Sequence, residues 1–568
     1  MAEAAVQTTR LAVRLVNHLK ARSIWAILRV ALLGWIPAAA LLPPLDRDES
    51  RFAEASRQMV ESGNYVDIRF ADTPRYNKPI GIYWLQAAFA TVSTPLLRSR
   101  IWIYRLPSLL GGFLSLLLLH GMARSTAPPR TAVLAVLLLG TSLLLTAESD
   151  IATTDAALLA AVIAAQAALM RVYLAARGGP GPPRALILGG WVALACGILL
   201  KGPVILAVLG VTALGLSLWD RDWRWLGGTR PLMGTIVAVI LVAPWALAIG
   251  FASHGAFYRQ SLGHDFAAKI LGGEESHGAP PGYYLALANL TFWPATLLLL
   301  PAIGFAVLRR KEALYRFLLA WSGGTWLLFE LVPTKLPHYI LPAYPALAFL
   351  AASWAASPQN ASAQRWERAF RLVASAQFAL VAAAIAGACI FLPARFGGTA
   401  SWPLFTGVAL GLAAAGAAVA LLLRRRAEPA ALLAMGTALI FYLVLALGVV
   451  PQLHDLWLSR RAAELVAAHR SSDGAPVVIA GYVEPSLVFL LGSNTQIETP
   501  GAAATAAAAH EGLALVEERV QPRFLSTLRH EGATALPVGS VSGLDYSTGH
   551  TQHITLYRVT RQLPERPG

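Results

Sequence analysis

The sequence predicts a polytopic α-helical membrane protein that ends in a small α/β domain. Hydrophobic residues make up 56% of the 568-residue chain and charged residues only 14%, whereas an ordinary soluble protein carries about 25% charged residues. Apolar runs close to the roughly 20 residues that a spanning helix needs recur along the first 450 residues. This pattern stops near residue 451, where short alternating segments replace the long runs. We therefore expect a membrane domain at 1–450 and a separate α/β domain at 451–568.

Fourteen apolar runs are candidates for crossing the membrane. They lie near residues 24–44, 80–97, 106–123, 131–147, 156–176, 185–200, 203–219, 232–253, 284–308, 314–332, 338–356, 371–393, 402–423 and 430–450. No small-residue cleavage site stands out after the first run, so we interpret it as an uncleaved span.

Basic residues collect in alternate loops between these runs, and short basic loops stay on the cytoplasmic side of a membrane. The basic residues of these loops are Arg124 and Arg130; Arg171, Arg177 and Arg184; Arg221, Arg224 and Arg230; Arg309, Arg310, Lys311 and Arg316; Arg365, Arg368 and Arg371; and Arg424, Arg425 and Arg426. The basic N-terminus is placed inside and the tail outside, so the number of crossings must be odd. We predict about 13 crossings, with the run at 80–97 re-entrant or interfacial.

The net charge of +15 follows from these loops. It indicates contact with anionic membrane lipids rather than binding of nucleic acid. The two cysteines, Cys196 and Cys389, lie in apolar runs, so neither a disulfide framework nor a zinc cluster is expected.

The loop at 45–79 is the most polar stretch in the first half of the chain, and charges of this number must lie in water or at the interface. Phe52, Ala55 and Met59 recur at helical spacing after Asp48, which predicts an amphipathic helix on the membrane surface. Gly63 is expected to end that helix. If the run at 80–97 does not cross, this loop lies outside.

The motifs of this loop are specific. Asp48-Glu49-Ser50-Arg51-Phe52-Ala53-Glu54, Glu61-Ser62-Gly63, Lys78-Pro79 and Tyr83-Trp84-Leu85 occur in this order. The loop resembles the first periplasmic loop of the polyprenyl-phosphate-sugar-dependent membrane glycosyltransferases, the family of the lipid A aminoarabinose transferases and the protein O-mannosyltransferases. The resemblance extends over the first 11 or so spans and fades towards the tail. It implies a GT-C-type architecture and inversion at the anomeric carbon.

Two further outside motifs match the same family. Glu148–Asp155 ends in an aspartate at the position where the family has a second active-site aspartate, although Asp155 could also cap the following helix. The run from Lys335 through Tyr339 to Pro345 resembles the family's K-x-x-x-Y-x-L-P-x-Y-P motif. Lys201-Gly202-Pro203 also lies outside; a lysine there could meet a phosphate, but a structural turn is favoured.

The expected catalytic residues are Asp48, which would orient or deprotonate the acceptor, and Asp155, which would support the same polar site. The expected substrate-binding residues are Glu49, Tyr76, Lys78, Tyr83, Arg259, Lys269, Lys335 and Tyr339. Among them, Lys78 and Lys335, helped by Arg259 or Lys269, would bind phosphate.

No metal or other cofactor is expected. The loop from Phe257 to Tyr284 contains His and Glu residues, but their spacing fits no closed zinc motif. The aminoarabinose transferase type has a metal-binding Glu before its Lys-Pro pair. Here that position is Asn77, which counts against a divalent cation.

These observations favour a glycosyltransferase that moves a sugar from a polyprenyl-phosphate donor to a lipid or glycan acceptor. Lipid A or lipopolysaccharide, at the periplasmic face of a bacterial inner membrane, is the favoured acceptor. A protein O-mannosyltransferase-like enzyme acting on Ser/Thr is the first alternative. A lipid transporter or flippase is the second, but we find no internal repeat of the kind that transporters show.

The tail is expected to fold as a mixed domain. Residues 476–480, 496–498 and 553–559 have strand patterns, and residues 484–491, 502–509 and 525–530 have helical patterns. The sequence GLDYSTG at 543–549 predicts a turn-rich loop.

Overall fold

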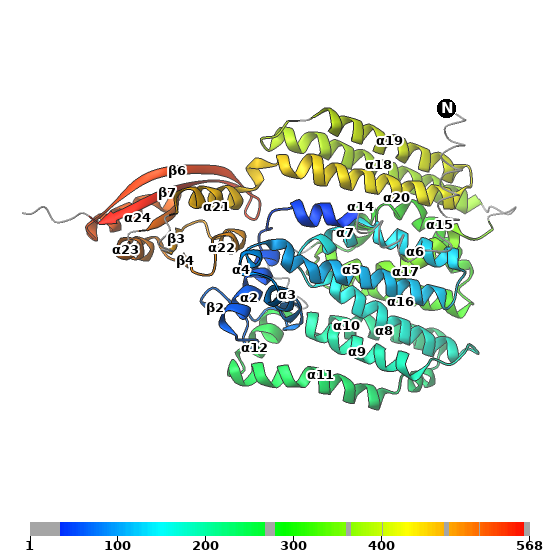
Figure 1. Ribbon diagram of the computed structural model, residues 1–568. Coiled ribbons are helices and arrows are strands. Elements are labelled where there is room, and N and C mark those ends of the chain that lie inside the picture. The colour runs from blue at the N-terminus through cyan, green and yellow to red at the C-terminus, as the bar shows by residue number, and fades with distance from the viewer. Residues whose placement is uncertain are drawn as a thin grey trace, which may run out of the picture.

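The computed structural model describes residues 34–266, 279–358, 365–399, 401–470, 476–510 and 512–561. It consists of a helix bundle joined to a smaller domain that contains a sheet (Figure 1). The chain is a multi-pass membrane protein, because several of its helices are long and apolar enough to cross a bilayer.

Seven helices of the described part meet this length and composition test, or eight if one bent pair counts as a span. The helices are α5 (Ile101–Arg124), α8 (Asp155–Ala175), α9 (Arg184–Lys201), α11 (Pro231–Ala252), α18 (Arg365–Arg395), α19 (Trp402–Leu423), and α20 (Ala427–Leu443) with its continuation η4 (Val444–Val449) and η5 (Val450–Gln452). The bent pair is α6 (Pro129–Gly140) and α7 (Leu143–Asp150), which meet at 61°.

This number is smaller than the 13 or so crossings that the apolar runs predicted. Several runs form shorter or interrupted helices: α10 (Val204–Asp220), α14 (Tyr283–Thr291), α15 (Thr296–Leu308), and η3 (Pro337–Ala343) followed by α17 (Tyr344–Ala355). A count of apolar runs does not register such breaks. The first run, 24–44, lies partly outside the described residues.

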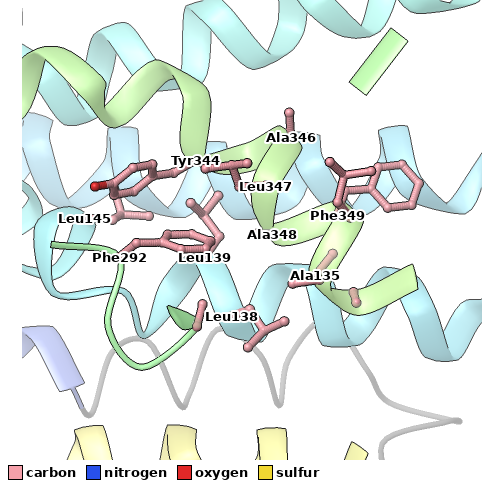
Figure 2. Close-up of a cluster of buried hydrophobic side chains, with 14 of the residues drawn as sticks. Ala135, Leu138, Leu139, Leu145, Phe292, Tyr344, Ala346, Leu347, Ala348 and Phe349 are labelled. Atoms are coloured by element: carbon pink, nitrogen blue, oxygen red, sulfur yellow. The ribbon is translucent and has the colours of Figure 1, made fainter. Parts of the chain in front are cut away.

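Helix α17 lies at the centre of the bundle, and every one of its residues is buried. Figure 2 shows Leu347 and Phe349 of this helix close to Ala135 and Leu139 of α6, with Phe292 beside Tyr344. A helix that is apolar all round is expected to be enclosed by other helices. The packing of α17 therefore explains why its run lacks an amphipathic pattern.

The basic loops that were predicted to share one face do contact one another. Asp220 at the end of α10 pairs with Arg177 (2.7 Å) and with Arg316 at the start of α16 (Ala313–Leu331). Arg130 pairs with Glu428 across the bundle. The short η1 (Arg224–Thr229) lies in one of these loops. The alternation of loops inferred from charge thus agrees with the arrangement of the helices.

The run at 80–97 does not form a spanning helix. It folds as α3 (Gly81–Val92) and α4 (Pro95–Arg98), and a 12-residue helix is only about 18 Å long. A bilayer core is about 30 Å thick, so α3 cannot cross it alone. The expectation that this run does not cross agrees with the structure.

The polar loop contains the predicted helix, α2 (Asp48–Ser62), which ends at Gly63 in a left-handed conformation (φ 71°). It is not the free surface helix that was predicted, because Glu54 and Arg57 of its polar side are buried as well. Its apolar residues Phe52, Ala55 and Met59 pack together with Ile80 and Tyr83. The short strands β1 (Arg69–Phe70) and β2 (Thr73–Pro74) form an antiparallel pair that leads to Lys78. The loop is therefore folded against α3 rather than loosely attached.

The C-terminal domain contains a five-stranded sheet of order β4-β3-β5-β7-β6. Its strands are β3 (Val477–Ala480), β4 (Gln496–Ile497), β5 (Leu513–Glu517), β6 (Ala533–Asp545) and β7 (His550–Arg561). β3 is parallel to β4 and β5, whereas β7 is antiparallel to β5 and β6. Its helical elements are η6 (His454–Leu456), α21 (Leu458–His469), α22 (Pro485–Leu491), α23 (Pro500–His510), η7 (Glu518–Val520) and α24 (Gln521–His530).

All six segments predicted in the tail are present in their predicted class. Helix α21 and strands β5 and β6 were not expected from the sequence. β5 is buried along its whole length, so it lacks the alternation that marks a half-buried strand.

Candidate active site

A cavity of about 370 Å³ opens where the outside motifs meet. Its polar lining comes from Asn77, Lys78, Asp155, Lys201, Tyr258, Ser261, His338 and Tyr339. Most of the remaining wall is apolar and comes from α9, α10, α11, α16 and the segment around α12 (Ala256–Tyr258). Trp245, Leu206 and Phe329 belong to this wall. Such a cavity can accept a ligand with a charged head and a hydrocarbon tail.

Asp155 and Lys201 form a buried ion pair in the cavity wall. The Lys201 Nζ lies 2.6 Å from Asp155 Oδ1 and 5.4 Å from the centre of the Tyr339 ring. Asp155 is the first residue of α8, but no side-chain cap bond forms at this helix start. The capping interpretation of Asp155 is therefore wrong.

Asp48 lies beside this cavity at the start of α2, and its side chain is 63% exposed. Arg75 Nη2 donates to Asp48 Oδ1 at 3.2 Å, and Arg75 Nε donates to the hydroxyl of Tyr83 at 3.2 Å. The surrounding protein displaces part of the water around Asp48 and so acts to raise its pKa, but the charges of Arg75 and Lys78 outweigh this effect, and the pKa lies below its usual value. Asp48 is therefore an exposed, ionised carboxylate.

His338 lies between the acidic groups. Its Nδ1 is 4.0 Å from Glu148 Oε1, and the Thr153 hydroxyl donates to Glu148 Oε2 at 2.9 Å. His338 lies within electrostatic range of both Asp48 and Asp155, but burial lowers its pKa to about 4, so its imidazole is neutral at neutral pH. The first loop, the 148–155 motif and the 335–345 motif thus meet in one polar cluster.

Glu49 was expected to contact the substrate, and the structure gives it a different position. It is 2% exposed and makes a bidentate contact with Arg105 at 2.7 and 2.8 Å. Its oxygens also accept the backbone N–H groups of Ala152 and Leu45. Glu49 is fully engaged inside the protein, so we assign it a structural role.

Tyr76 and Tyr83 are not among the lining residues, although Tyr76 packs against Phe257 of the cavity wall. Tyr76 donates its hydroxyl to Asp67 at 2.8 Å and is 5% exposed. Tyr83 is fully buried and supports Arg75. Neither residue lines the cavity, so the expectation that they bind substrate directly has to be corrected.

Lys335 was expected to bind phosphate, but it closes the end of a helix. Its Nζ donates to the carbonyl oxygens of Glu330 (2.7 Å), Val332 (3.0 Å) and Phe329 (3.4 Å). These carbonyls belong to the C-terminal end of α16, where a cation is favoured. Lys335 is 5% exposed and does not line the cavity.

The loop from Phe257 to Tyr284 contributes fewer residues to the cavity than expected. Arg259, in η2 (Arg259–Phe266), is exposed and donates to the carbonyl of His254 at 3.4 Å. It does not line the cavity, although Ser261 does. Lys269 lies outside the described residues.

Three residues of the cluster were not among the site residues expected from the sequence: Arg75, Lys201 and His338. Lys201 was noted at an outside turn and His338 within a family motif, so a signal existed for both. Arg75 had none, because only the fold of the loop brings its guanidinium to Asp48.

In the described ranges, no group of three or more His, Cys, Asp or Glu residues is placed to hold a metal ion. Glu274, Glu275 and His277 of the loop from Phe257 to Tyr284 lie outside those ranges. The expectation that the protein uses no metal stays a prediction.

Known proteins resemble this chain in sequence over part of its length. Residues 77–247 match the family model described as dolichyl-phosphate-mannose-protein mannosyltransferase. The undecaprenyl phosphate-alpha-4-amino-4-deoxy-L-arabinose arabinosyl transferase of Pseudomonas aeruginosa is 30% identical over 321 residues, which are 56% of this chain and 54% of that protein. The protein of the same name from Pectobacterium carotovorum is 31% identical over 54% of each chain. The match thus spans about half the length of these relatives.

Solved structures extend the likeness to nearly the whole chain. The crystal structure of ArnT from Cupriavidus metallidurans bound to undecaprenyl phosphate matches with a TM-score of 0.74 and 20% identity, over 94% of this chain and 97% of that one. The apo structure of the same protein gives 0.72 and 18%, over 94% and 98%. The resemblance to this glycosyltransferase family is confirmed. The GT-C-type architecture predicted from the sequence is confirmed as well.

Proposed function

We propose that the protein is an inverting glycosyltransferase that moves a sugar from a polyprenyl-phosphate donor to lipid A or lipopolysaccharide. The cavity is the observation that carries this proposal, because a largely apolar wall ends at Lys78 and Lys201. An ammonium group binds phosphate oxygens as a point charge. The names of the arabinosyl transferase relatives and the bound lipid of the Cupriavidus structure support this donor class.

The proposed reaction forms a bond between an acceptor oxygen and the anomeric carbon while the bond to the donor phosphate breaks. The polyprenyl phosphate leaves with the electron pair of that bond. Lys78 would stabilise the charge that grows on the phosphate. The pair of Asp155 and Lys201 would keep the lysine in place and set the polarity of the cavity end.

Asp48 is placed to act on the acceptor. Its carboxylate is exposed and ionised beside the cavity. An acceptor hydroxyl would give its proton to Asp48, whereas a phosphate acceptor is already ionised and would need only to be oriented. The motifs that face the cavity were assigned to the outside by the basic loops, so the site would face the periplasm of a bacterial inner membrane.

A second candidate is transfer to Ser or Thr of proteins. It is favoured by one observation, the match of residues 77–247 to the protein mannosyltransferase model. The cavity does not discriminate between the two, because both reactions use a polyprenyl- or dolichyl-type phosphate. The arabinosyl transferase relatives extend over more of the chain, and we therefore prefer the lipid acceptor.

The test uses purified protein with an undecaprenyl-phosphate-linked sugar and, in parallel, lipid A or a Ser/Thr-rich peptide as the acceptor. Transfer is followed by mass spectrometry of both products. We expect sugar on lipid A. Sugar on the peptide alone would establish the second candidate, and transfer to neither acceptor would contradict the proposal.

Two carboxylate variants then locate the chemistry. Asp48→Asn and Asp155→Asn keep the shape of each side chain but remove its charge, so both should lose most transfer while the protein stays folded. The matched control is Asp72→Asn, because Asp72 is exposed in the β1–β2 turn. Normal transfer by both site variants would show that the carboxylates do not serve the reaction.

A further inference from the structure

Helix α22 of the C-terminal domain inserts a phenylalanine beside α2, the helix of the first loop. Phe489 is fully buried and packs in one cluster with Ala53 of α2, Ala90 of α3, Tyr104 of α5 and Ala152. Its ring meets that of Tyr104 edge-on, with 5.6 Å between the centroids. The socket for this side chain is thus built by three helices of the membrane part, and α22 lies next to α2 in Figure 1.

A charged side chain of α2 also holds α22 at this position. Arg57 of α2 donates from Nη1 to the carbonyl oxygen of Phe489 at 2.9 Å, and its guanidinium lies 4.9 Å from the centre of the Phe489 ring. Arg57 is itself buried and paired with Glu54 one helical turn away. Buried polar groups must be paired, so α22 completes the environment of this face of α2.

The residues just before α2 are bound by the C-terminal domain as well. Asp46 accepts the hydroxyl and, at 3.3 Å, the backbone N–H of Ser486, and its own N–H donates to the Tyr546 hydroxyl at 2.8 Å. Arg47 Nη2 donates to the carbonyl of Ser547 at 2.7 Å. These two residues immediately precede Asp48.

Arg47 has a backbone conformation that needs outside support. Its φ is 64°, a positive value that residues other than glycine rarely adopt. This turn directs the chain into α2, and no side-chain cap bond forms there. The C-terminal domain therefore contacts the chain at the strained turn that leads into α2, through Asp46 and Arg47.

From these contacts we infer that the C-terminal domain positions Asp48 for transfer, with Phe489 as the anchoring residue. The inference rests on the proposed function, because it concerns the carboxylate of that site. Phe489 is a positioning residue: it touches neither the cavity nor Asp48 and acts through α2. Loss of the anchor would let the start of α2 move, and misplacement of a reacting group by about 1 Å can lower a rate by a factor on the order of 100.

The experiment compares Phe489→Ala with Phe524→Ala in the full-length protein. Phe524 is equally buried, but it packs against Tyr557 in the other core of the C-terminal domain. Hydrogen–deuterium exchange of residues 45–62 and the steady-state constants for transfer are measured for both variants. Phe489→Ala should speed exchange in this segment and lower kcat by roughly ten- to a hundredfold.

The donor KM separates positioning from general damage. The cavity is built mainly by α9, α10, α11, α16 and η3, so the KM should stay within about twofold of wild type in Phe489→Ala. Phe489→Leu, which refills most of the socket, should restore kcat. Phe524→Ala should leave exchange in residues 45–62 unchanged.

Unchanged exchange in Phe489→Ala, or an equal effect of Phe524→Ala, would overturn the inference. If Phe489→Ala does not fold, Ser486→Ala and Tyr546→Phe are used instead, because each removes one hydrogen bond to Asp46. Faster exchange of residues 45–62 in these variants would support the inference, and unchanged exchange would overturn it. Failure of the proposed function gives a different result: the wild type would transfer no sugar, while exchange in residues 45–62 would still respond to Phe489.

Discussion

At the scale of single residues, the state of Asp48 depends on Arg75. The protein around Asp48 displaces part of its water and so acts to raise its pKa, but the charges of Arg75 and Lys78 outweigh this effect and hold the pKa below its usual value. A lowered pKa keeps the charge until the pH falls through that lowered value. The ionised form of Asp48 should therefore persist to unusually acidic pH.

This dependence predicts a pH shift. Arg75→Gln removes one of the two cations, so the pKa of Asp48 should rise and the acid limb of the pH–rate profile for transfer should move to higher pH. The measurement is transfer rate against pH for the wild type and the variant. Arg69→Gln is the control, because Arg69 is an exposed residue that pairs with Asp67 at 3.6 Å. An acid limb at the same pH in Arg75→Gln would contradict the assignment of Asp48 as the titrating group.

At the scale of elements, the position of a charged residue at the end of a helix determines whether its side chain faces the cavity. Glu49, at the second position of α2, binds Arg105 of α5, and Arg105 also donates to the carbonyls of Ala39, Leu42 and Pro43. This contact joins the start of the first loop to a spanning helix. Glu49 and Asp48 are neighbours in the sequence, but the helix turns one inward and leaves the other exposed.

The two predicted phosphate-binding lysines should consequently behave differently. Lys78→Ala removes a cation from the cavity, and loss of one charge-assisted contact costs about 1.5–3 kcal/mol, or roughly ten- to a hundredfold in donor affinity. Lys335→Ala instead exposes the carbonyl end of α16 and should cost about 1–2 kcal/mol of stability. Donor binding and thermal unfolding in detergent are measured for both variants.

The expected pattern is weak donor binding with normal stability for Lys78→Ala, and lowered stability with retained donor affinity in the folded fraction for Lys335→Ala. Donor binding lost in a stable Lys335→Ala protein would return Lys335 to the phosphate site.

At the scale of the whole molecule, the charged loops divide between two ends of the bundle. At one end, Asp220 forms ion pairs with Arg177 and Arg316. Asp155, Lys201 and His338 line the cavity at the other end. The C-terminal domain contacts the first loop near that cavity through Asp46 and Phe489. Cavity, first loop and C-terminal domain therefore belong to one side.

This arrangement predicts the topology. A reporter that is active only outside the cytoplasm should be active when fused after Arg561 and inactive when fused after Arg426. Whole-cell reporter activity, corrected for the amount of fusion protein, is the measurement. Activity only after Arg426 would invert the orientation and place the cavity in the cytoplasm.

The sequence alone determined the class of fold, the alternation of the loops and the identity of the main motifs. These features are local: apolar runs, basic loops and short ordered patterns are all carried by neighbouring residues. Asp48, Asp155 and Lys78 were found in this way, and the structure brings Asp155 and Lys78 into the cavity wall with Asp48 beside them.

Only the tertiary structure decided which charges face the cavity. Lys335 and Lys201 both sit at outside turns of the sequence, yet the first closes α16 and the second pairs with Asp155 in the cavity wall. Arg75, the partner of Asp48, was not recognised at all. The physical reason is that a buried charge must find a partner, and that partner comes from segments distant in sequence. The packing of the helices determines which partner each charged residue finds, and no local sequence pattern encodes that packing.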